Sequence, residues 1–314
     1  MSSQISPAPG TDGIEGVVVI DKAVGLTSHD VVAAVRRIVG SKPGRRGNRK
    51  GPKVGHAGTL DPDATGVLVV CIGRSTRLVP YLQASTKTYD ARMRLGRTTT
   101  TLDNQGEETS VSDASSVTEE KLCEALKQFV GDIQQIPPMV SAIKVDGERL
   151  YAKARRGEVV KRKPRPVTIH DIVLADFTPG PQAEASFLVT CSAGTYIRSL
   201  AADVGDLLGV GAHLTGLRRL GSGRFSVDEA HDLDTLTQMA ESGQFADAVM
   251  SPAEAMTDYP SIMLAAEDAN AVRNGRAVAS SGTVGIACAL DPDGDLVGVM
   301  RDDGTHLRPE VVFN

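Results

Sequence analysis

The chain has 314 residues, 41% of them hydrophobic and none of them tryptophan, and its formal net charge is −5. This length is enough for two packed cores, so we expect one large domain and one small one. No run of about 18 apolar residues occurs, and the N-terminus lacks a basic start followed by an apolar core. The sequence therefore predicts neither a membrane span nor a signal peptide, and we expect a cytoplasmic protein.

The four cysteines give no sign of a metal site. Cys71, Cys123, Cys191 and Cys288 stand singly in apolar runs, without a CxxC pair or a histidine cluster that could complete a zinc site. We expect reduced core residues and no metal.

The net charge hides two strongly basic segments. Residues 42–53 carry six cations and no acid, and residues 144–165 carry nine cations against three acids. The rest of the chain is acidic, so positive charge is concentrated where a phosphate backbone could meet it. Solvated or disordered charge runs are the alternative, which composition alone leaves open.

Hydrophobic periodicity predicts strands mixed with helices, without a regular alternation. Tyr89, Ala91, Met93 and Leu95 alternate on one face of a strand, which predicts a half-buried position in a sheet. In chain order we expect a disordered tail at 1–13, a strand at 16–21, a helix at 28–39, a flexible loop at 42–53, a strand at 67–73, a helix near 78–82 and a strand at 87–95.

Ser116 and Glu119 fit a capping box for a helix that runs to Gly131. Further expected elements are strands near 140–145, 167–177 and 185–192, a helix at 196–208, a strand at 213–220 and a helix near 233–243. This order favours a mixed α+β fold.

From about Asp258 the pattern changes to short strands separated by Gly, Asp and Pro turns, with one helix near 267–274. The run DPDGD at 291–295 superficially resembles a calcium loop, but it lacks the twelve-residue spacing and the terminal glutamate of such loops. We interpret it as a hairpin turn between two strands.

The segment GHAGTLDPDATG at 55–66 is the most unusual one in the chain, and three interpretations compete for it. Asp-Pro between glycines is ordinary turn chemistry. Asp61, Asp63 and Thr65 also fit the D-x-D-x-T pattern of an aspartyl phosphatase. That pattern should follow a long apolar strand and be accompanied by an acidic magnesium cluster, and the sequence has neither. The third interpretation is a different aspartate nucleophile, supported by the neighbouring blocks.

Five blocks carry that third interpretation. In chain order they are VVVIDKAVGLTSHDVV, HAGTLDPDATGVLVVCIGRSTR, KTYDARMRLGRTTTTLDNQG, IPPMVSAIKVDGERLYAKARRG and GTYIRSLAADVGDLLGVGAHLTGLRRL. Together they closely resemble the TruB family of tRNA pseudouridine synthases, in the same order, from about Gly16 to Phe225. The C-terminal module resembles a PUA RNA-binding domain more weakly.

The resemblance implies an α+β fold with a mixed, mainly antiparallel sheet. The pseudouridine synthase catalytic domain would span residues 14–250 and include a thumb-like RNA-binding insertion at about 141–165. A small β-rich PUA-like domain would follow at 258–314.

The resemblance also implies the reaction, the isomerisation of uridine 55 in the T-loop of tRNA to pseudouridine. Asp61 would be the nucleophile, acting at the sugar, at the base or through a glycal, and these routes stay open. The reaction has no net redox change, so no cofactor is expected. An ionised Asp61 in a dry pocket needs a fixed cation, which by resemblance is Arg198. Tyr89 and Tyr196 would stack on the base and line the pocket.

The target base must leave its stack before it can react. By resemblance His56 fills the vacated place, Leu217 helps to bind the flipped uridine, and Lys22 lies near the pocket. Each of three residues also has a purely structural alternative: a surface salt bridge for Arg198, core packing for Tyr89 and a structural histidine in a turn for His56. Two departures from the family pattern are Ala23, where proline is usual, and Arg77, where lysine is common.

The predicted partner is the T-stem-loop of tRNA, bound mainly through charge and shape. We expect a monomer with no obligatory protein partner. The basic loop 42–53 is predicted to add nonspecific affinity for tRNA. The predicted contacts to the RNA backbone are Lys144, Arg149, Lys153, Arg155, Arg156, Lys161, Arg162 and Lys163.

The rival from another class is a noncatalytic RNA-binding protein or tRNA-folding chaperone on the same scaffold. Guide-RNA-dependent relatives are disfavoured by the histidine of HAGTLDP and by the thumb insertion.

Overall fold

The computed structural model describes residues 11, 13–43, 49–141, 144–145, 147–150, 153, 156, 158 and 160–314. These residues form two compact units, one from 1–83 together with 222–314 and the other from 84–221. The predicted tail at 1–13 lies outside the described residues except for Thr11 and Gly13. Thr11 is buried, and its hydroxyl donates to the Ile38 carbonyl.

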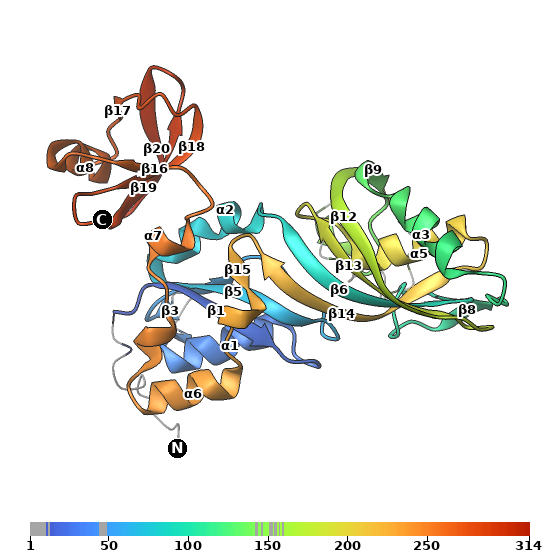
Figure 1. The fold of residues 1–314 in the computed structure, drawn as a ribbon. Coiled ribbons are helices and arrows are strands. Elements are labelled where there is room, and N and C mark those ends of the chain that lie inside the picture. The colour runs from blue at the N-terminus through green and yellow to red at the C-terminus, as the bar shows by residue number, and fades with distance from the viewer. Residues whose placement is uncertain are drawn as a thin grey trace. The chain divides into compact units, whose positions relative to one another are not determined.

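In the first unit, the apolar strands β1 (Gly16–Lys22) and β5 (Thr65–Ile72) pair antiparallel. They lie beside the helices α1 (Ser28–Ile38) and α6 (Leu233–Glu241) (Figure 1). β1 and β5 pair over seven residues, and both are almost entirely buried because β-branched residues occupy successive positions. The elements before residue 84 are β1 (Gly16–Lys22), α1 (Ser28–Ile38), β2 (Lys42–Pro43), β3 (Arg49–Lys50), β4 (Val54–His56), β5 (Thr65–Ile72) and α2 (Val79–Gln83).

The basic segment 42–53 differs from its prediction as a loop. Strands β2 and β3 pair antiparallel, with Lys42 opposite Lys50 and Pro43 opposite Arg49, while residues 44–48 lie outside the described part of the chain. Backbone pairing across so short a segment is invisible to side-chain periodicity, because two residues cannot show an alternation.

The C-terminal part of the first unit contains a five-stranded sheet in the order β16-β18-β19-β20-β17, packed against one helix (Figure 1). This bears out the β-rich module, and the antiparallel β18–β19 pair confirms 291–295 as a hairpin turn. The elements are β15 (Phe225–Ser226), α6 (Leu233–Glu241), α7 (Pro252–Ala255), β16 (Ser261–Met263), α8 (Ala266–Arg273), β17 (Val278–Ala279), β18 (Gly285–Leu290), β19 (Leu296–Asp302) and β20 (His306–Val312).

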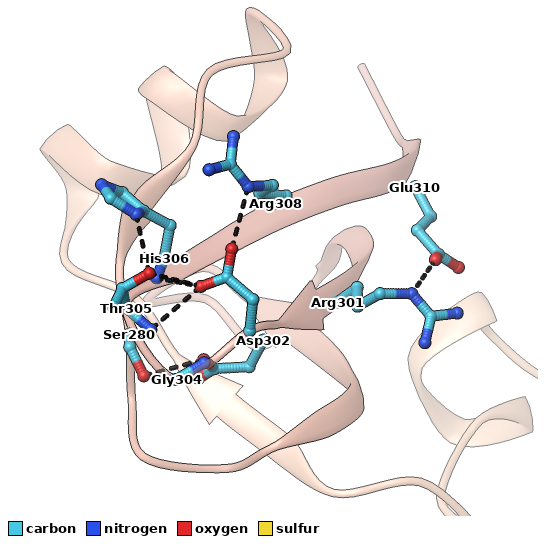
Figure 2. A network of polar contacts seen from close by, with 9 residues as sticks. Ser280, Arg301, Asp302, Gly304, Thr305, His306, Arg308 and Glu310 are labelled. Atoms are coloured by element: carbon cyan, nitrogen blue, oxygen red, sulfur yellow. Dashed lines mark hydrogen bonds and ion pairs between the residues drawn. The ribbon is translucent and has the colours of Figure 1, made fainter.

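Two adjacent aspartates, Asp302 and Asp303, fix the turn between β19 and β20, and Figure 2 labels the first of them. The Asp302 carboxylate is buried and accepts hydrogen bonds from the Ser280 hydroxyl and the Gly304 amide, both at 2.8 Å. Asp303 accepts from the Thr305 hydroxyl at 2.6 Å, from the His306 amide at 2.7 Å and from Arg308 at 3.1 Å. These donors favour the ionised form and lower the pKa of both carboxyl groups.

The second unit is built on a strand order of β14-β6-β13-β12-β9, with α3 and α5 packed side by side against the sheet (Figure 1). The pairs of β13 with β6 and of β12 with β13 and β9 are antiparallel, as predicted for this fold. The elements are β6 (Lys87–Leu95), β7 (Arg97–Thr99), β8 (Glu108–Val111), α3 (Glu119–Lys127), β9 (Gly131–Gln135), β10 (Lys144–Val145), β11 (Glu148–Arg149), β12 (Arg165–Thr178), β13 (Glu184–Cys191), α5 (Ile197–Leu207) and β14 (Ala212–Ser222).

The predicted capping box of α3 is wrong by two residues. Thr118, and not Ser116, is the N-cap, because its hydroxyl accepts the Lys121 amide at 3.3 Å. Val117 and Leu122 on either side of this cap are buried, which is the pattern of a hydrophobic staple. The helix also ends at Lys127 and does not reach Gly131.

Three of the four cysteines are buried core residues as predicted, while Cys123 is only half-buried, and all four are free thiols. Burial raises the pKa of Cys71 to about 12 and of Cys191 and Cys288 to about 11, which keeps these thiols protonated and unreactive. None of the helices among the described residues is long and apolar enough to cross a membrane. The described residues also contain no cluster of side chains able to hold a metal ion.

Candidate active site

Asp61 lies, half-buried, on the loop between β4 and β5, and the main chain of this loop is fixed on both sides of it. Before Asp61, the Ser28 hydroxyl accepts the Leu60 amide at 2.9 Å and donates to the Leu60 carbonyl at 3.0 Å. After it, the Pro62 carbonyl accepts the Gly25 amide at 2.9 Å. A carboxylate presented on so constrained a loop is pre-positioned, as a nucleophile requires.

Lys22, at the end of β1, anchors the same loop. Its side chain is fully buried, and its ammonium donates to the carbonyls of Ala23, Leu26 and Pro62 at 2.9, 2.8 and 3.1 Å. An ammonium has three N–H donors, and these three carbonyls match that number. This is the geometry of a structural anchor, and the role of Lys22 in substrate binding stays a prediction.

His56 ends β4, five residues before Asp61, and its ring is half-exposed. The ring centroid lies 5.7 Å from that of His29 in the first turn of α1, with an interplanar angle of 61°. The Ala57 amide donates to the Val69 carbonyl at 2.9 Å, which fixes the backbone next to the ring. Three predicted residues of the first unit thus lie at the ends of two strands and on one loop: Lys22 ends β1, His56 ends β4, and Asp61 lies on the loop after β4.

Arg198 lies in the first turn of α5 in the second unit, and it is buried with 6% exposure. Its guanidinium pairs with the Asp103 carboxylate at 2.9 Å and donates to the carbonyls of Val140 and Thr101 at 2.9 and 3.3 Å. The alternative of a surface salt bridge is therefore wrong. Removing either partner of a buried ion pair is costly, whereas an exposed pair contributes little.

Tyr196 is the N-cap of α5, and its main chain is held by one buried side chain. Gln135, at the end of β9, accepts the Tyr196 amide at 2.7 Å and donates to the Tyr196 carbonyl at 3.0 Å. Gln135 thereby satisfies the Tyr196 amide, one of the amides at the start of α5 that have no partner within the helix. The helix start that carries Tyr196 and Arg198 is therefore fixed from β9.

Tyr89 and Leu217 lie on neighbouring strands, β6 and β14. Tyr89 is 8% exposed on the core face of its strand, and Leu217 is half-buried. Exposure of this size agrees with core packing for Tyr89 and leaves its proposed stacking on the base as a prediction.

Asp103 and Gln135 support Arg198 and Tyr196, but neither was predicted from the sequence. Asp103 is the sole acid between Asp90 and Glu107, and it follows a run of four threonines in a turn-rich segment. That isolation is the one signal that marks it. Gln135 carries no signal, because its function depends on a strand end meeting a helix start 61 residues later.

The basic insertion divides into side chains held by the protein and side chains that are exposed. Arg156 pairs with Glu148 and Glu158 at 2.5 and 2.7 Å, which raises its pKa, and Arg162 donates to the Pro137 carbonyl at 2.9 Å. Lys161 and Lys163 are exposed and Lys153 is half-buried. Arg155 and the side chains of Lys144 and Arg149 lie outside the described residues.

Comparisons with known proteins agree with these features. Residues 45–197 match the N-terminal domain of TruB family pseudouridylate synthases, 198–257 match the tRNA pseudouridylate synthase B C-terminal domain, and 259–314 match the C-terminal model of tRNA pseudouridine synthase II. A tRNA pseudouridine synthase B of Arthrobacter sp. is 42% identical over 96% of this chain and 97% of its own. A second, from Thermobifida fusca, is 43% identical over 95% and 98%.

Solved structures give the same answer at lower identity. A Cbf5-Nop10-Gar1 complex has a chain that is 28% identical, with a TM-score of 0.72 over 95% of this chain and 85% of that one. An H/ACA RNP bound to a substrate RNA contains a chain 25% identical, with a TM-score of 0.72 over 100% and 91%.

Fold and sequence together define an enzyme of the pseudouridine synthase class. Within that class the chain belongs to the TruB family, whose members it matches along almost its whole length.

Proposed function

We propose that this enzyme isomerises uridine 55 in the T-loop of tRNA to pseudouridine, as a stand-alone protein with Asp61 as the nucleophile. Relatives named tRNA pseudouridine synthase B, 42–43% identical over nearly the full chain, support tRNA as the substrate. The observation that carries the mechanism is the Asp61 loop, whose main chain is fixed at Leu60 and Pro62 around a half-exposed carboxylate.

The isomerisation breaks the bond between C1′ of the ribose and N1 of uracil, and it forms a bond between C1′ and C5. The hydrogen on C5 leaves as a proton, and N1 gains one, so electrons balance without an oxidant or a reductant. The Asp61 carboxylate can form a transient bond at C1′ or at the base, or it can take a proton from the ribose on the way to a glycal. In each route it must be ionised at the start, and we assign Arg198 as the cation that favours this form.

The remaining roles follow the family resemblance. His56 fills the stack that the flipped nucleotide leaves, Tyr89 and Tyr196 contact the base, and Leu217 helps to hold it. The domain assignment goes with these roles, with catalysis in residues 14–250 and RNA binding in the thumb at about 141–165 and the PUA-like domain at 258–314. Among the thumb cations, the exposed Lys161 and Lys163 are the best placed to meet phosphates.

The test is incubation of the pure protein with an unmodified tRNA transcript, followed by chemical mapping of pseudouridine. We expect product at position 55 with wild type and none with Asp61→Asn, while Asp63→Asn, an exposed neighbour in the same loop, serves as the matched control. Product at another position would refute the site specificity, and equal product from Asp61→Asn would remove Asp61 as the nucleophile. Tight binding without product from wild type would support the noncatalytic rival.

A further inference from the structure

The loop that carries Asp103, residues 99–106, has a strained backbone. Leu102 has a φ of +64°, and among the described residues it is the only non-glycine residue with a positive φ. Leucine rarely adopts this conformation, so the surrounding contacts must impose it. The strained residue directly precedes Asp103, which pairs with Arg198. The fold therefore tolerates an unfavourable backbone conformation at Leu102 while it holds Asp103 in place.

Several contacts impose this conformation from inside the second unit. The Leu214 amide of β14 donates to the Leu102 carbonyl at 3.0 Å, and the Thr99 hydroxyl donates to the Asp103 carbonyl at 2.7 Å. Gly106 closes the loop, since a Cβ there would lie 2.6 Å from the Thr101 backbone nitrogen. Any side chain at this position would therefore force the loop backbone to shift.

His213 on β14 contacts both β7, which leads into this loop, and Asn104 within the loop. Its ring is buried, with 2% exposure, and Nδ1 lies 2.9 Å from the Arg97 carbonyl, while Nε2 lies 3.1 Å from the Asn104 side-chain oxygen. The Asn104 amide nitrogen donates in turn to the Thr215 carbonyl at 3.1 Å. The Arg97 carbonyl can only accept, so Nδ1 carries the proton of this contact, and Nε2 contacts the Asn104 side chain; the ring thus links Arg97 to the residue after Asp103.

The Asp103 carboxylate takes its direction from this loop. One oxygen accepts from the Thr101 hydroxyl at 2.5 Å and from the Gln105 amide at 3.0 Å, and the other pairs with Arg198 at 2.9 Å. Any shift of the loop therefore moves the carboxylate that holds the guanidinium.

We propose that His213 is a positioning residue for the reaction: through Asn104 it holds the strained loop 99–106, so that Asp103 keeps Arg198 in its reactive place. The proposal rests on the proposed function, because it assigns Arg198 to the reacting site. His213 itself touches no substrate in this scheme, and its effect passes through the loop.

The test compares His213→Phe, which keeps the ring size and loses both nitrogens, with His213→Gln, which keeps one polar group. We expect the single-turnover rate of pseudouridine formation at saturating tRNA to fall about 10- to 100-fold for His213→Phe, the size of a small misplacement of a reacting group. His213→Gln should recover part of the rate, and tRNA affinity should stay within about twofold of wild type. Glu107→Gln, exposed just beyond the same loop, is the matched control and should leave both quantities unchanged.

If His213→Phe does not fold, Asn104→Ala tests the same contact from its other side. Asn104 is exposed, so we expect this variant to fold, and it removes the side chain that His213 contacts. In the Asp103→Asn background the His213 substitution should add little, since both changes act through one contact. Unchanged rates for His213→Phe and Asn104→Ala, additive effects with Asp103→Asn, or a loss confined to tRNA affinity would each overturn the proposal. An inactive wild type would instead overturn the proposed function.

Discussion

The buried pair of Asp103 and Arg198 allows stability and catalysis to be separated in one experiment. At 2.9 Å and an effective dielectric of about 20, unit charges attract by about 6 kcal/mol. Asp103→Asn loses less than this, because Asn keeps an oxygen and Arg198 keeps the carbonyls of Val140 and Thr101. With side chains 7% and 19% exposed, we expect the free energy of unfolding to fall by about 2–3 kcal/mol.

The double variant Asp103→Leu/Arg198→Met is the informative comparison. Replacing both members of a buried pair by apolar groups is often neutral, so its free energy of unfolding should return to within about 1 kcal/mol of wild type. Its rate of pseudouridine formation should nevertheless stay at background, because the cation is gone. Urea unfolding gives the first quantity, and loss of a hydrogen label from C5 of the target uridine gives the second.

Two results would refute this reasoning. A cost below about 0.5 kcal/mol for Asp103→Asn would mean that the pair behaves like an exposed one. A double variant that forms pseudouridine at the wild-type rate would mean that Arg198 is not needed for the reaction, whatever it contributes to the fold.

Three further predictions concern stability and are read by chemical unfolding. Lys22→Met should cost about 3 kcal/mol or more, because three carbonyls around a fully buried ammonium lose their donor; a cost near zero would contradict the anchor. Thr118→Ala should cost about 1 kcal/mol while Ser116→Ala costs almost nothing, and the reverse order would restore the original assignment of the N-cap. Burial and the neighbouring Asp206 raise the pKa of Asp203 from 3.8 to about 6, so the folded state binds its proton more tightly and stability falls as pH rises through this window. Asp203→Asn should therefore stabilise the protein by about 1 kcal/mol above pH 6, after allowance for solvent screening, and give no gain below pH 3.8.

Elements with long, regular patterns were predictable from the sequence. β6 alternates between polar and apolar residues over the eight positions 88–95, and α1 repeats its valines at helical spacing, so each pattern has one structural solution. The ends of α3 were not predictable to the residue, since Ser116 and Thr118 both suit an N-cap. Thr118 is the N-cap because the helix then buries Val117 and Leu122 on either side of the cap.

The residues proposed for the site come from sequence blocks, whereas the contacts that support them were not predictable. Asp61, His56 and Arg198 stand in distinctive blocks, whereas the contacts that hold them are between segments far apart in the chain. Asp103 meets Arg198 across 95 residues, and Gln135 meets Tyr196 across 61. Side chains that act through backbone carbonyls leave no pattern in the sequence, because every residue has such a carbonyl.

The first unit is assembled from both ends of the chain, and this has a consequence for synthesis on the ribosome. Its core joins Val17 and Val69 to Phe225 and Phe313, so the N-terminal strands cannot complete their packing until Phe313 has emerged. Residues 84–221 are contiguous and can fold first, as domains generally do during translation. Until then β1 and β5 remain an apolar pair without their cover. A nascent chain that has exposed residues 1–221 and no more would thus carry a finished second unit together with an apolar, aggregation-prone strand pair.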